Sequence, residues 1–278
     1  MHHYAVMAYI IFLLSVLLAI AAVYASAIGW LYLRQERLLF EPERLSPEQR
    51  LCPDEDVHES FVDVPGARLS VAQLRLPNPR GVVFFLHGNS GNLHKWMVGL
   101  DAYRELDFDV GMFDYRGFGK SSGQIESEAQ LRADVRAVWS QFAPQYQGKR
   151  IVISGQSLGS GLAAGLSAEL CADGRAPDLT MMVSAYSSMQ ALGAELYPWV
   201  PTRVLRYPLA TLELACRLTG NLMLIHGDKD ELIGYHHSET LRRAMPQAQL
   251  LCVEGAGHGD VHQFPSFRQG VASALARL

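Results

Sequence analysis

The 278-residue sequence lacks a basic stripe and any glycine motif for nucleotides. Its 24 Lys and Arg and 28 Asp and Glu give a formal net charge of −4, which argues against nucleic acid as a partner. It contains neither a G-x-x-x-x-G-K-[ST] nor a G-x-G-x-x-G pattern, and such patterns mark phosphate cradles. We therefore expect neither a nucleotide cofactor nor a nucleic-acid partner.

Cysteine is also scarce, and no C-x-x-C pair occurs. The four cysteines are scattered through the chain, at Cys52, Cys171, Cys216 and Cys252. Three of them lie in apolar surroundings that suit buried thiols. This usage favours a reducing compartment and argues against a metal site.

Charge is absent from one long segment, Tyr4 to Leu33. As a helix, residues 5–28 alone would extend about 36 Å, which is enough to cross the hydrocarbon core of a bilayer. Aromatic residues at both ends of the segment suit the membrane interfaces. The sequence therefore predicts a single-pass membrane anchor over residues 1–33.

Two other interpretations of this segment are weaker. Ala25-Ser26-Ala27 has the form of a signal-peptidase site, but the apolar run is longer than a typical signal peptide and no Lys or Arg precedes it. A buried core helix would show an amphipathic face, which is missing here. Arginines gather only on the C-terminal side, which favours a cytoplasmic catalytic domain; they are Arg34, Arg37, Arg44 and Arg50.

A polar connector, residues 34–60, follows the anchor and contains the helix-stopping Pro42 and Pro47. Residues 61–278 show no linker, repeat or low-complexity tract, so we expect one catalytic domain. It opens with a predicted β-hairpin, 61–64 and 68–74. Continuous apolar runs that suit strands buried on both faces follow at 82–86, 110–113, 151–153, 179–183, 222–225 and 250–253.

Helical stretches alternate with these runs. In one of them Leu131, Val135 and Phe142 recur at spacings typical of a helix. The alternation predicts an α/β fold with a mostly parallel sheet and helices on both faces. In such folds the functional residues lie at the carboxyl ends of the strands.

Gly155-Gln156-Ser157-Leu158-Gly159 lies between one apolar run and a small-residue helix. A G-x-S-x-G motif between a strand and a helix is typical of a nucleophile elbow, in which a sharp turn exposes the serine hydroxyl. A glycine turn without catalytic function remains the alternative, so the prediction depends on partners for Ser157.

Candidates for the acid follow the apolar run 222–225, and a candidate histidine base follows the run 250–253. His258 lies in a glycine-rich loop after the last run, with His262 in reserve. Asp228, Asp230 and Glu231 are all candidates for the acid. The chain order Ser, acid, His is that of an α/β-hydrolase triad, in which the base activates the serine and the acid orients the base.

The loop 87–92 follows the earliest apolar run of the sheet and would border the same site. Acyl transfer needs donors for the developing oxyanion. We expect the backbone N–H groups of Asn89 and Leu158 to be these donors.

Five segments together resemble the α/β-hydrolase superfamily: HGNSGN at 87–92, DYRGFGKSSG at 114–123, GQSLG at 155–159, HGDKD at 226–230 and GAGH at 255–258. The chain is most similar to membrane-anchored hydrolase-domain proteins of the serine aminopeptidase and monoacylglycerol-lipase-like branch. The resemblance implies that Asp230 is the acid, that the catalytic site needs no metal or other cofactor, and that the segment 187–220 forms a small lid or none.

These observations predict a membrane-anchored serine hydrolase in which Ser157, His258 and Asp230 cleave an ester or thioester. Lipid-derived acyl groups are among the expected substrates. The alternatives are an amide or peptide hydrolase and a non-catalytic interaction protein on a hydrolase scaffold. The sequence leaves the physiological substrate and the oligomeric state open.

Overall fold

Eight strands form the central sheet, in the order β10-β9-β8-β7-β4-β6-β3-β2. The computed structural model describes residues 2–278, so Met1 of the expected anchor lies outside it. The strands are β2 (Val57–Val64), β3 (Ala67–Leu74), β4 (Gly81–Leu86), β6 (Phe108–Phe113), β7 (Arg150–Gln156), β8 (Leu179–Val183), β9 (Asn221–Gly227) and β10 (Gln249–Val253).

Most neighbouring strands are parallel, and only β2 with β3 and β3 with β6 pair antiparallel. The predicted mostly parallel sheet is therefore confirmed. Each apolar run of the sequence lies in one strand, and the hairpin begins at Val57 instead of Phe61.

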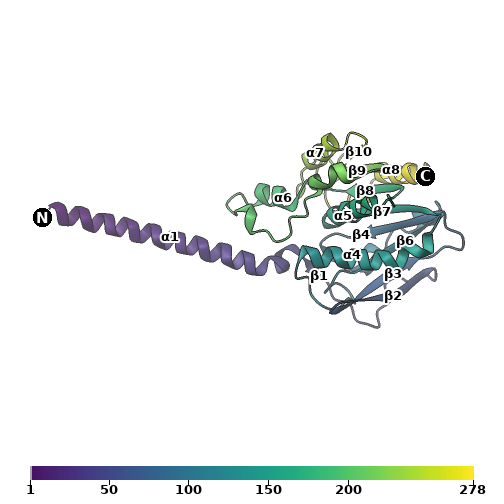
Figure 1. The fold of residues 1–278 in the computed structure, drawn as a ribbon, viewed down its shortest axis with the longest axis horizontal. Coiled ribbons are helices and arrows are strands. Elements are labelled where there is room, and N and C mark those ends of the chain that lie inside the picture. The colour runs from purple at the N-terminus through teal and green to yellow at the C-terminus, as the bar shows by residue number, and fades with distance from the viewer. Residues whose placement is uncertain (1) are drawn as a thin grey trace.

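Helices cover both faces of the sheet (Figure 1). Val82 and Phe84 of β4 pack in the same apolar cluster as residues of α4 and α5, whereas Val83 packs in the cluster that includes α8. Consecutive residues of β4 are thus buried on opposite faces, which is why its sequence is continuously apolar. The helices that follow β4 are α2 (Leu93–Trp96), α3 (Asp101–Arg104), α4 (Glu128–Phe142), α5 (Leu158–Ala172), α6 (Met189–Leu196), α7 (His236–Ala244) and α8 (Pro265–Ala276).

The segment between β8 and β9 forms a small cap, which agrees with the short lid implied by the resemblance. It contains α6 and two 3₁₀ helices, η2 (Thr202–Val204) and η3 (Thr211–Arg217). Ser188 caps α6, because its hydroxyl accepts a hydrogen bond from the N–H of Ala191 at 2.9 Å. The remaining 3₁₀ helices are η1 (Ala143–Tyr146) and η4 (Val261–Gln263).

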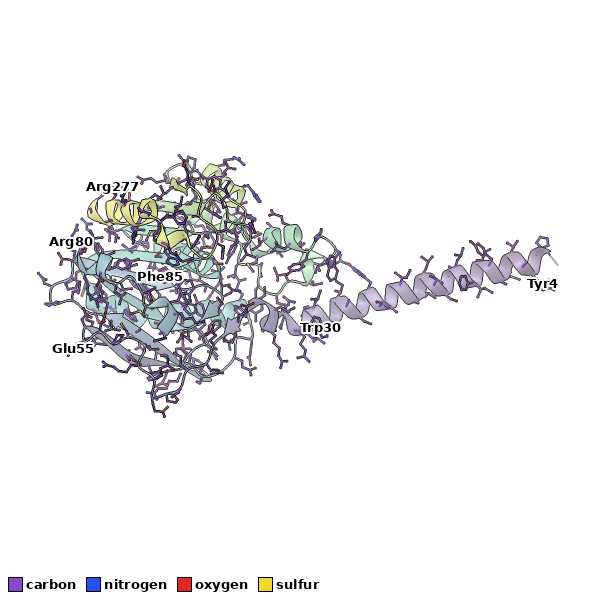
Figure 2. The ribbon with its side chains drawn as sticks, turned by 180° about the vertical axis from the view of Figure 1, so that it is seen from behind. Tyr4, Trp30, Glu55, Arg80, Phe85 and Arg277 are labelled. Carbon is purple, nitrogen blue, oxygen red and sulfur yellow. The ribbon has the colours of Figure 1, made fainter. Side chains whose placement is uncertain are left out.

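The N-terminal helix α1 (His2–Leu39) projects from the rest of the protein (Figure 1). Among the described residues it is the one helix long and apolar enough to cross a membrane, by length and composition alone. The mean hydropathy of its 18-residue apolar window is 2.8. Residues 3–26 are exposed throughout. Figure 2 shows Tyr4 at the far end and Trp30 where the helix approaches the sheet and its helices.

The expected connector is more ordered than its sequence suggests. The helix continues past Leu33 to Leu39, and then β1 (Glu41–Pro42) pairs in parallel with β5 (Ser90–Gly91). β5 belongs to the loop that follows β4, so the end of α1 is tied to the edge of the sheet where a functional site was expected.

Candidate active site

Ser157 occupies a strained turn between β7 and α5. Its backbone has φ 53° and ψ −121°, in the left-handed half of φ space that residues with a side chain rarely adopt. The side chain is mostly buried, with 8% of the residue exposed. Strain of this kind at a non-glycine residue is concentrated at functional sites. This geometry is that of the predicted nucleophile elbow.

The two glycines of the motif allow the turn because other backbone approaches them too closely for a Cβ. A Cβ on Gly155 would collide with the carbonyl oxygen of Gly159, and a Cβ on Gly159 would collide with the carbonyl oxygen of Leu86 at the end of β4. The glycines therefore let α5 start directly above β7 and β4. The spacing of G-x-S-x-G follows from these two contacts.

The structure brings the three predicted catalytic side chains together in one hydrogen-bonded chain. Nε2 of His258 lies 3.1 Å from Oγ of Ser157, and Nδ1 of His258 lies 2.8 Å from Oδ2 of Asp230. In this arrangement Ser157 donates to the imidazole, and Nδ1–H of the imidazole donates to the carboxylate. The three residues follow β7, β10 and β9, as expected from the apolar runs.

Asp230 is held as a carboxylate by its neighbours. Burial alone would raise its pKa, but hydrogen bonds from His226, from His258 and from the N–H of Ile233 outweigh burial and hold the pKa well below its usual range. Oδ1 accepts the N–H groups of Leu232 and Ile233 at 3.0 and 2.8 Å. The carboxylate is thus both charged and fixed in direction, as a group that orients a histidine must be.

His226 positions the acid loop, a function that the sequence did not reveal. It is fully buried at the end of β9, where Nδ1 contacts Ser238 Oγ and Nε2 contacts the carbonyl oxygen of Ile233, each at 2.7 Å. Nε2 also lies 3.4 Å from Oδ2 of Asp230. His226 therefore braces the loop that carries the acid. The one feature of the sequence that could have indicated this function is the position of His226 at the end of a buried strand.

The other candidates for acid and base lie elsewhere. Oδ1 of Asp228 accepts the N–H of Gly255 at 2.6 Å, so Asp228 supports the loop before His258 and does not contact its ring. Glu231 and His262 are exposed. His236 and His237 lie at the start of α7, and both approach Glu195 instead of Ser157.

One predicted oxyanion donor, Leu158, directly follows Ser157, and the other, Asn89, lies in the loop after β4. Leu158 is the first residue of α5, where a backbone N–H has no carbonyl one turn earlier to bind. The loop after β4 passes close to the serine, because a Cβ on Gly88 would lie 3.8 Å from Cβ of Ser157. The N–H of Asn89 makes no hydrogen bond with another described residue. Both amides therefore remain available to a ligand beside the serine.

The residues at the end of α1 fix the position of Asn89. Its carbonyl oxygen accepts the N–H of Glu41 at 2.8 Å, and its side-chain amide donates to the carbonyl oxygen of Leu39 at 3.1 Å. Leu39 and Glu41, at the end of α1 and just after it, thus hold the backbone of this loop from outside the sheet. This contact was not expected from the sequence.

Two buried titratable groups, His87 and Asp114, support the same loop from the inside. Burial lowers the pKa of His87 to about 4 and raises the pKa of Asp114 to about 7, so near neutral pH His87 is uncharged and Asp114 is only about half ionised. Oδ1 of Asp114 accepts the N–H of Leu93 at 2.9 Å, which holds the start of α2. The hydroxyl of Tyr115 donates to the carbonyl oxygen of His87 at 2.8 Å.

Comparison with known proteins agrees with this geometry. The family model described as serine aminopeptidase, S33, matches residues 77–207. An uncharacterized protein of Mycobacterium tuberculosis is 30% identical over 260 residues, which cover 89% of this chain and 88% of that protein. The chain belongs to the α/β-hydrolase superfamily. Human alpha/beta hydrolase domain-containing protein 17B is 26% identical to this hydrolase. The aligned region covers 73% of the present chain and 70% of the human protein.

Solved structures of distant relatives share the hydrolase fold. An esterase of Pyrococcus furiosus aligns with a TM-score of 0.66 and 19% identity, over 86% of this chain and 97% of the esterase. A thioesterase domain from the curacin biosynthetic pathway aligns with a TM-score of 0.55 and 15% identity, over 79% of this chain and 99% of that domain. At these identities the likeness shows the fold alone.

Proposed function

We propose that this hydrolase is a membrane-anchored serine hydrolase that cleaves an ester or thioester through an acyl-enzyme. The observation that carries the proposal is the hydrogen-bonded chain from Ser157 through His258 to Asp230, placed beside two free amides. A serine hydroxyl becomes a useful nucleophile when an oriented histidine takes its proton. Here the nucleophile, base and acid lie at hydrogen-bonding distance from one another.

In the proposed reaction Oγ of Ser157 attacks the acyl carbonyl while Nε2 of His258 takes its proton. The N–H groups of Asn89 and Leu158 stabilise the negative charge on the carbonyl oxygen, and Asp230 stabilises the imidazolium. His258 then gives the proton to the leaving alcohol or thiol. Water attacks the acyl-enzyme with His258 again as the base, which releases the acid and restores Ser157.

The position of the site relative to α1 supports a substrate at the membrane surface. Arg80, which directly precedes β4, lies at the end of the molecule farthest from α1 (Figure 2). The carboxyl ends of the parallel strands, with Ser157, therefore face the anchor. From Ser26, where the continuously exposed part of the apolar stretch ends, to Leu39 the helix rises about 20 Å, so the site would lie close above the bilayer.

The cap also contacts the anchor. The hydroxyl of Tyr24 donates to the carbonyl oxygen of Trp199 at 2.9 Å, and the side chain of Gln35 binds the carbonyl oxygen of Val204 at 2.7 Å. Around the first contact the cap exposes apolar side chains, with Tyr197 56% and Trp199 52% exposed. Aromatic side chains at this level of a membrane-spanning helix suit the lipid interface. Lipid-derived acyl groups are therefore the proposed substrate class.

The arginines that follow the apolar stretch, beginning with Arg34 and Arg37, favour a cytoplasmic position for the hydrolase domain. A protease-protection assay on sealed membrane vesicles of known orientation tests this sidedness. We expect protease to digest the hydrolase domain only when the cytoplasmic face of the membrane is exposed to it. Digestion only from the opposite face would contradict the proposed sidedness.

A matched substrate panel tests the bond type. The full chain in detergent micelles is given esters, thioesters and aminoacyl amides that carry the same acyl group, together with Ser157→Ala as the control. We expect ester and thioester cleavage by the wild type and none by the variant. The serine aminopeptidase description of the matched family favours amide cleavage as the second candidate, and preferential cleavage of the amides would replace the ester assignment. A folded wild type that cleaves nothing would favour a non-catalytic scaffold.

A further inference from the structure

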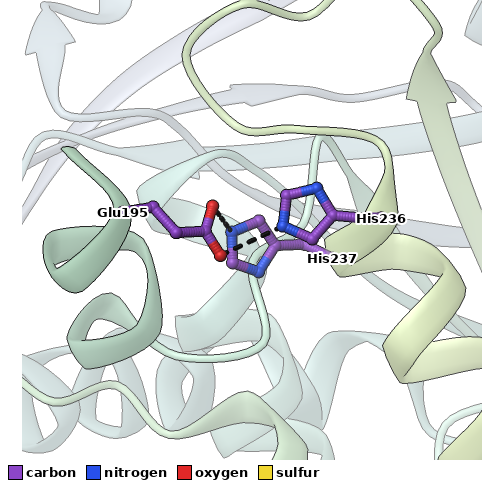
Figure 3. Close-up of side chains that lie close together, drawn as sticks. All are labelled: Glu195, His236 and His237. Atoms are coloured by element: carbon purple, nitrogen blue, oxygen red, sulfur yellow. Dashed lines mark hydrogen bonds and ion pairs between the residues drawn. The ribbon is translucent and has the colours of Figure 1, made fainter.

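Glu195, His236 and His237 form a cluster of metal-ligating side chains separate from the catalytic triad (Figure 3). Glu195 is the penultimate residue of α6 in the cap, and the two histidines are the first residues of α7. One ligand atom from each residue lies within 4.8 Å of the other two. The cluster therefore connects the cap to the helix that follows the Asp230 loop.

The distances in the cluster are close to those of a metal site. Nε2 of His236 lies 3.0 Å from Oε1 of Glu195, and Nε2 of His237 lies 3.3 Å from Oε2. Tetrahedral Zn²⁺ with bonds of roughly 2.0 to 2.2 Å places neighbouring ligand atoms about 3.3 Å apart. The two histidine rings stack at 4.5 Å between centroids. The side chain of His236 is 56% exposed, so its ring is free to adjust.

His237 provides an independent indication of a ligand. The residue is 1% exposed, and its Nε2 points toward Glu195 at 3.3 Å from Oε2 without forming a regular hydrogen bond with any described residue. A buried nitrogen without a regular hydrogen bond is unfavourable, and a metal ion would satisfy it.

Ser187 can hold His237 in the tautomer that a metal requires. Its Oγ lies 3.0 Å from Nδ1, so it can accept a hydrogen bond from Nδ1–H when Nε2 binds the metal. Metal-binding histidines commonly use the second ring nitrogen in this way. The longer hydrogen bond from the N–H of Ser187 to Nδ1, at 3.3 Å, would be given up.

We propose that Glu195, His236 and His237 bind one divalent ion of the Zn²⁺ type, with water as the fourth ligand. Two imidazoles and one carboxylate are a ligand set that suits Zn²⁺ and similar transition metals. The ion would cross-link α6 to α7 and restrict movement of the cap. The sequence argued against a metal site because its cysteines are scattered, and these three ligands come together only in the fold.

Zn²⁺ titration of the metal-stripped full chain in detergent tests the site. We expect one Zn²⁺ per chain in isothermal titration calorimetry, and binding at least about 10-fold weaker in Glu195→Gln and in His236→Asn, since each variant removes one ligand. Both residues are exposed, so the variants should fold. Glu213→Gln in the same cap and His262→Gln outside it are matched controls that should bind as the wild type does.

Limited trypsin digestion supplies a second readout that needs no substrate. Arg203 lies exposed in η2 of the cap, and Zn²⁺ should slow cleavage there in the wild type and in the controls but not in Glu195→Gln. No Zn²⁺ binding by the wild type below about 100 µM, or equal binding by all variants, would overturn the site. Binding that needs Glu195 but leaves Arg203 equally sensitive would overturn the cross-link.

Discussion

Asp228 and Asp230 lie two residues apart, yet their carboxylates have different partners. Asp230 accepts a hydrogen bond from the ring of His258, whereas Asp228 accepts one from the backbone N–H of Gly255. The sequence alone left both carboxylates open, and only the resemblance to a family pattern favoured Asp230. The structure explains the difference, because the loop from β9 turns Asp230 inward onto the histidine.

Replacement of these two residues should therefore give unequal losses. Asp230→Asn should lower kcat for ester cleavage by roughly 10⁴-fold, since an amide at this position favours the wrong tautomer of the histidine. Asp228→Asn keeps an oxygen that can accept the N–H of Gly255, and this residue does not contact the histidine. The variant should therefore lower kcat by less than about 10-fold. Steady-state kinetics on the two variants decides the assignment, and equal losses would refute it.

His87 and Asp114 make opposite contributions to the pH dependence of stability. Between about pH 4 and 6.5, folding removes the proton that an unfolded His87 would hold but adds one to Asp114. The pair holds about one proton in both states, so its net effect is nearly flat. In Asp114→Asn only His87 remains, with a folded pKa below its unfolded value.

Stability of Asp114→Asn should therefore fall as the pH falls from 6.5 toward 4, at up to about 1.4 kcal/mol per pH unit relative to wild type. Above pH 6.5 the His87 contribution disappears, because the histidine is neutral in both states. Urea unfolding of both proteins across this range measures the difference. Parallel stability curves would show that burial does not keep Asp114 protonated in the folded protein.

At the scale of elements, the strands were predictable and the contacts of the connector were not. Residues 82–86 are apolar on both faces because the sheet is covered on both sides, so the pattern is visible in the sequence. β1 has only two residues and carries no pattern of its own. Its pairing with β5 is a long-range backbone contact, and the continuation of α1 past Leu33 likewise depends on contacts with the distant cap.

The β1–β5 pairing predicts different outcomes for two truncated chains. A chain that starts at Leu39 keeps the partners of Asn89, whereas a chain that starts at Phe61 loses them and part of β2 as well. The shorter chain should lose roughly 10² to 10³ in kcat for a soluble ester, the usual cost of an oxyanion donor. The longer one should stay near the activity of the full protein.

Circular dichroism of both truncated chains separates loss of the site from loss of the fold. Equal activity of two folded chains would show that the connector does not position the oxyanion loop.

For the whole molecule, the contact between the cap and α1 would hold the proposed catalytic site close to the membrane surface. Tyr197 and Trp199 should help the site to receive substrate from the lipid interface. In proteoliposomes, the double change Tyr197→Ser and Trp199→Ser should lower hydrolysis of a bilayer-embedded ester by at least roughly 10-fold, since burial of even one large apolar side chain contributes about 1.5 to 3 kcal/mol. Hydrolysis of a water-soluble ester should not change.

Phe61→Ser is the matched control for this test, because Phe61 is 40% exposed on the edge strand β2. It should leave both activities unchanged. A loss on the soluble ester equal to the loss on the embedded ester would mean that the cap residues act on the site itself and not on access from lipid.

The most direct test of the central claim is covalent labelling of the full-length protein with a fluorophosphonate probe, followed by mapping of the modified peptide by mass spectrometry. We expect one modification, on Ser157, in the wild type and none in Ser157→Ala, and much slower labelling in His258→Ala because the base is missing. Labelling that persists in Ser157→Ala, or a folded wild type that is not labelled, would contradict the assignment of Ser157 as the nucleophile.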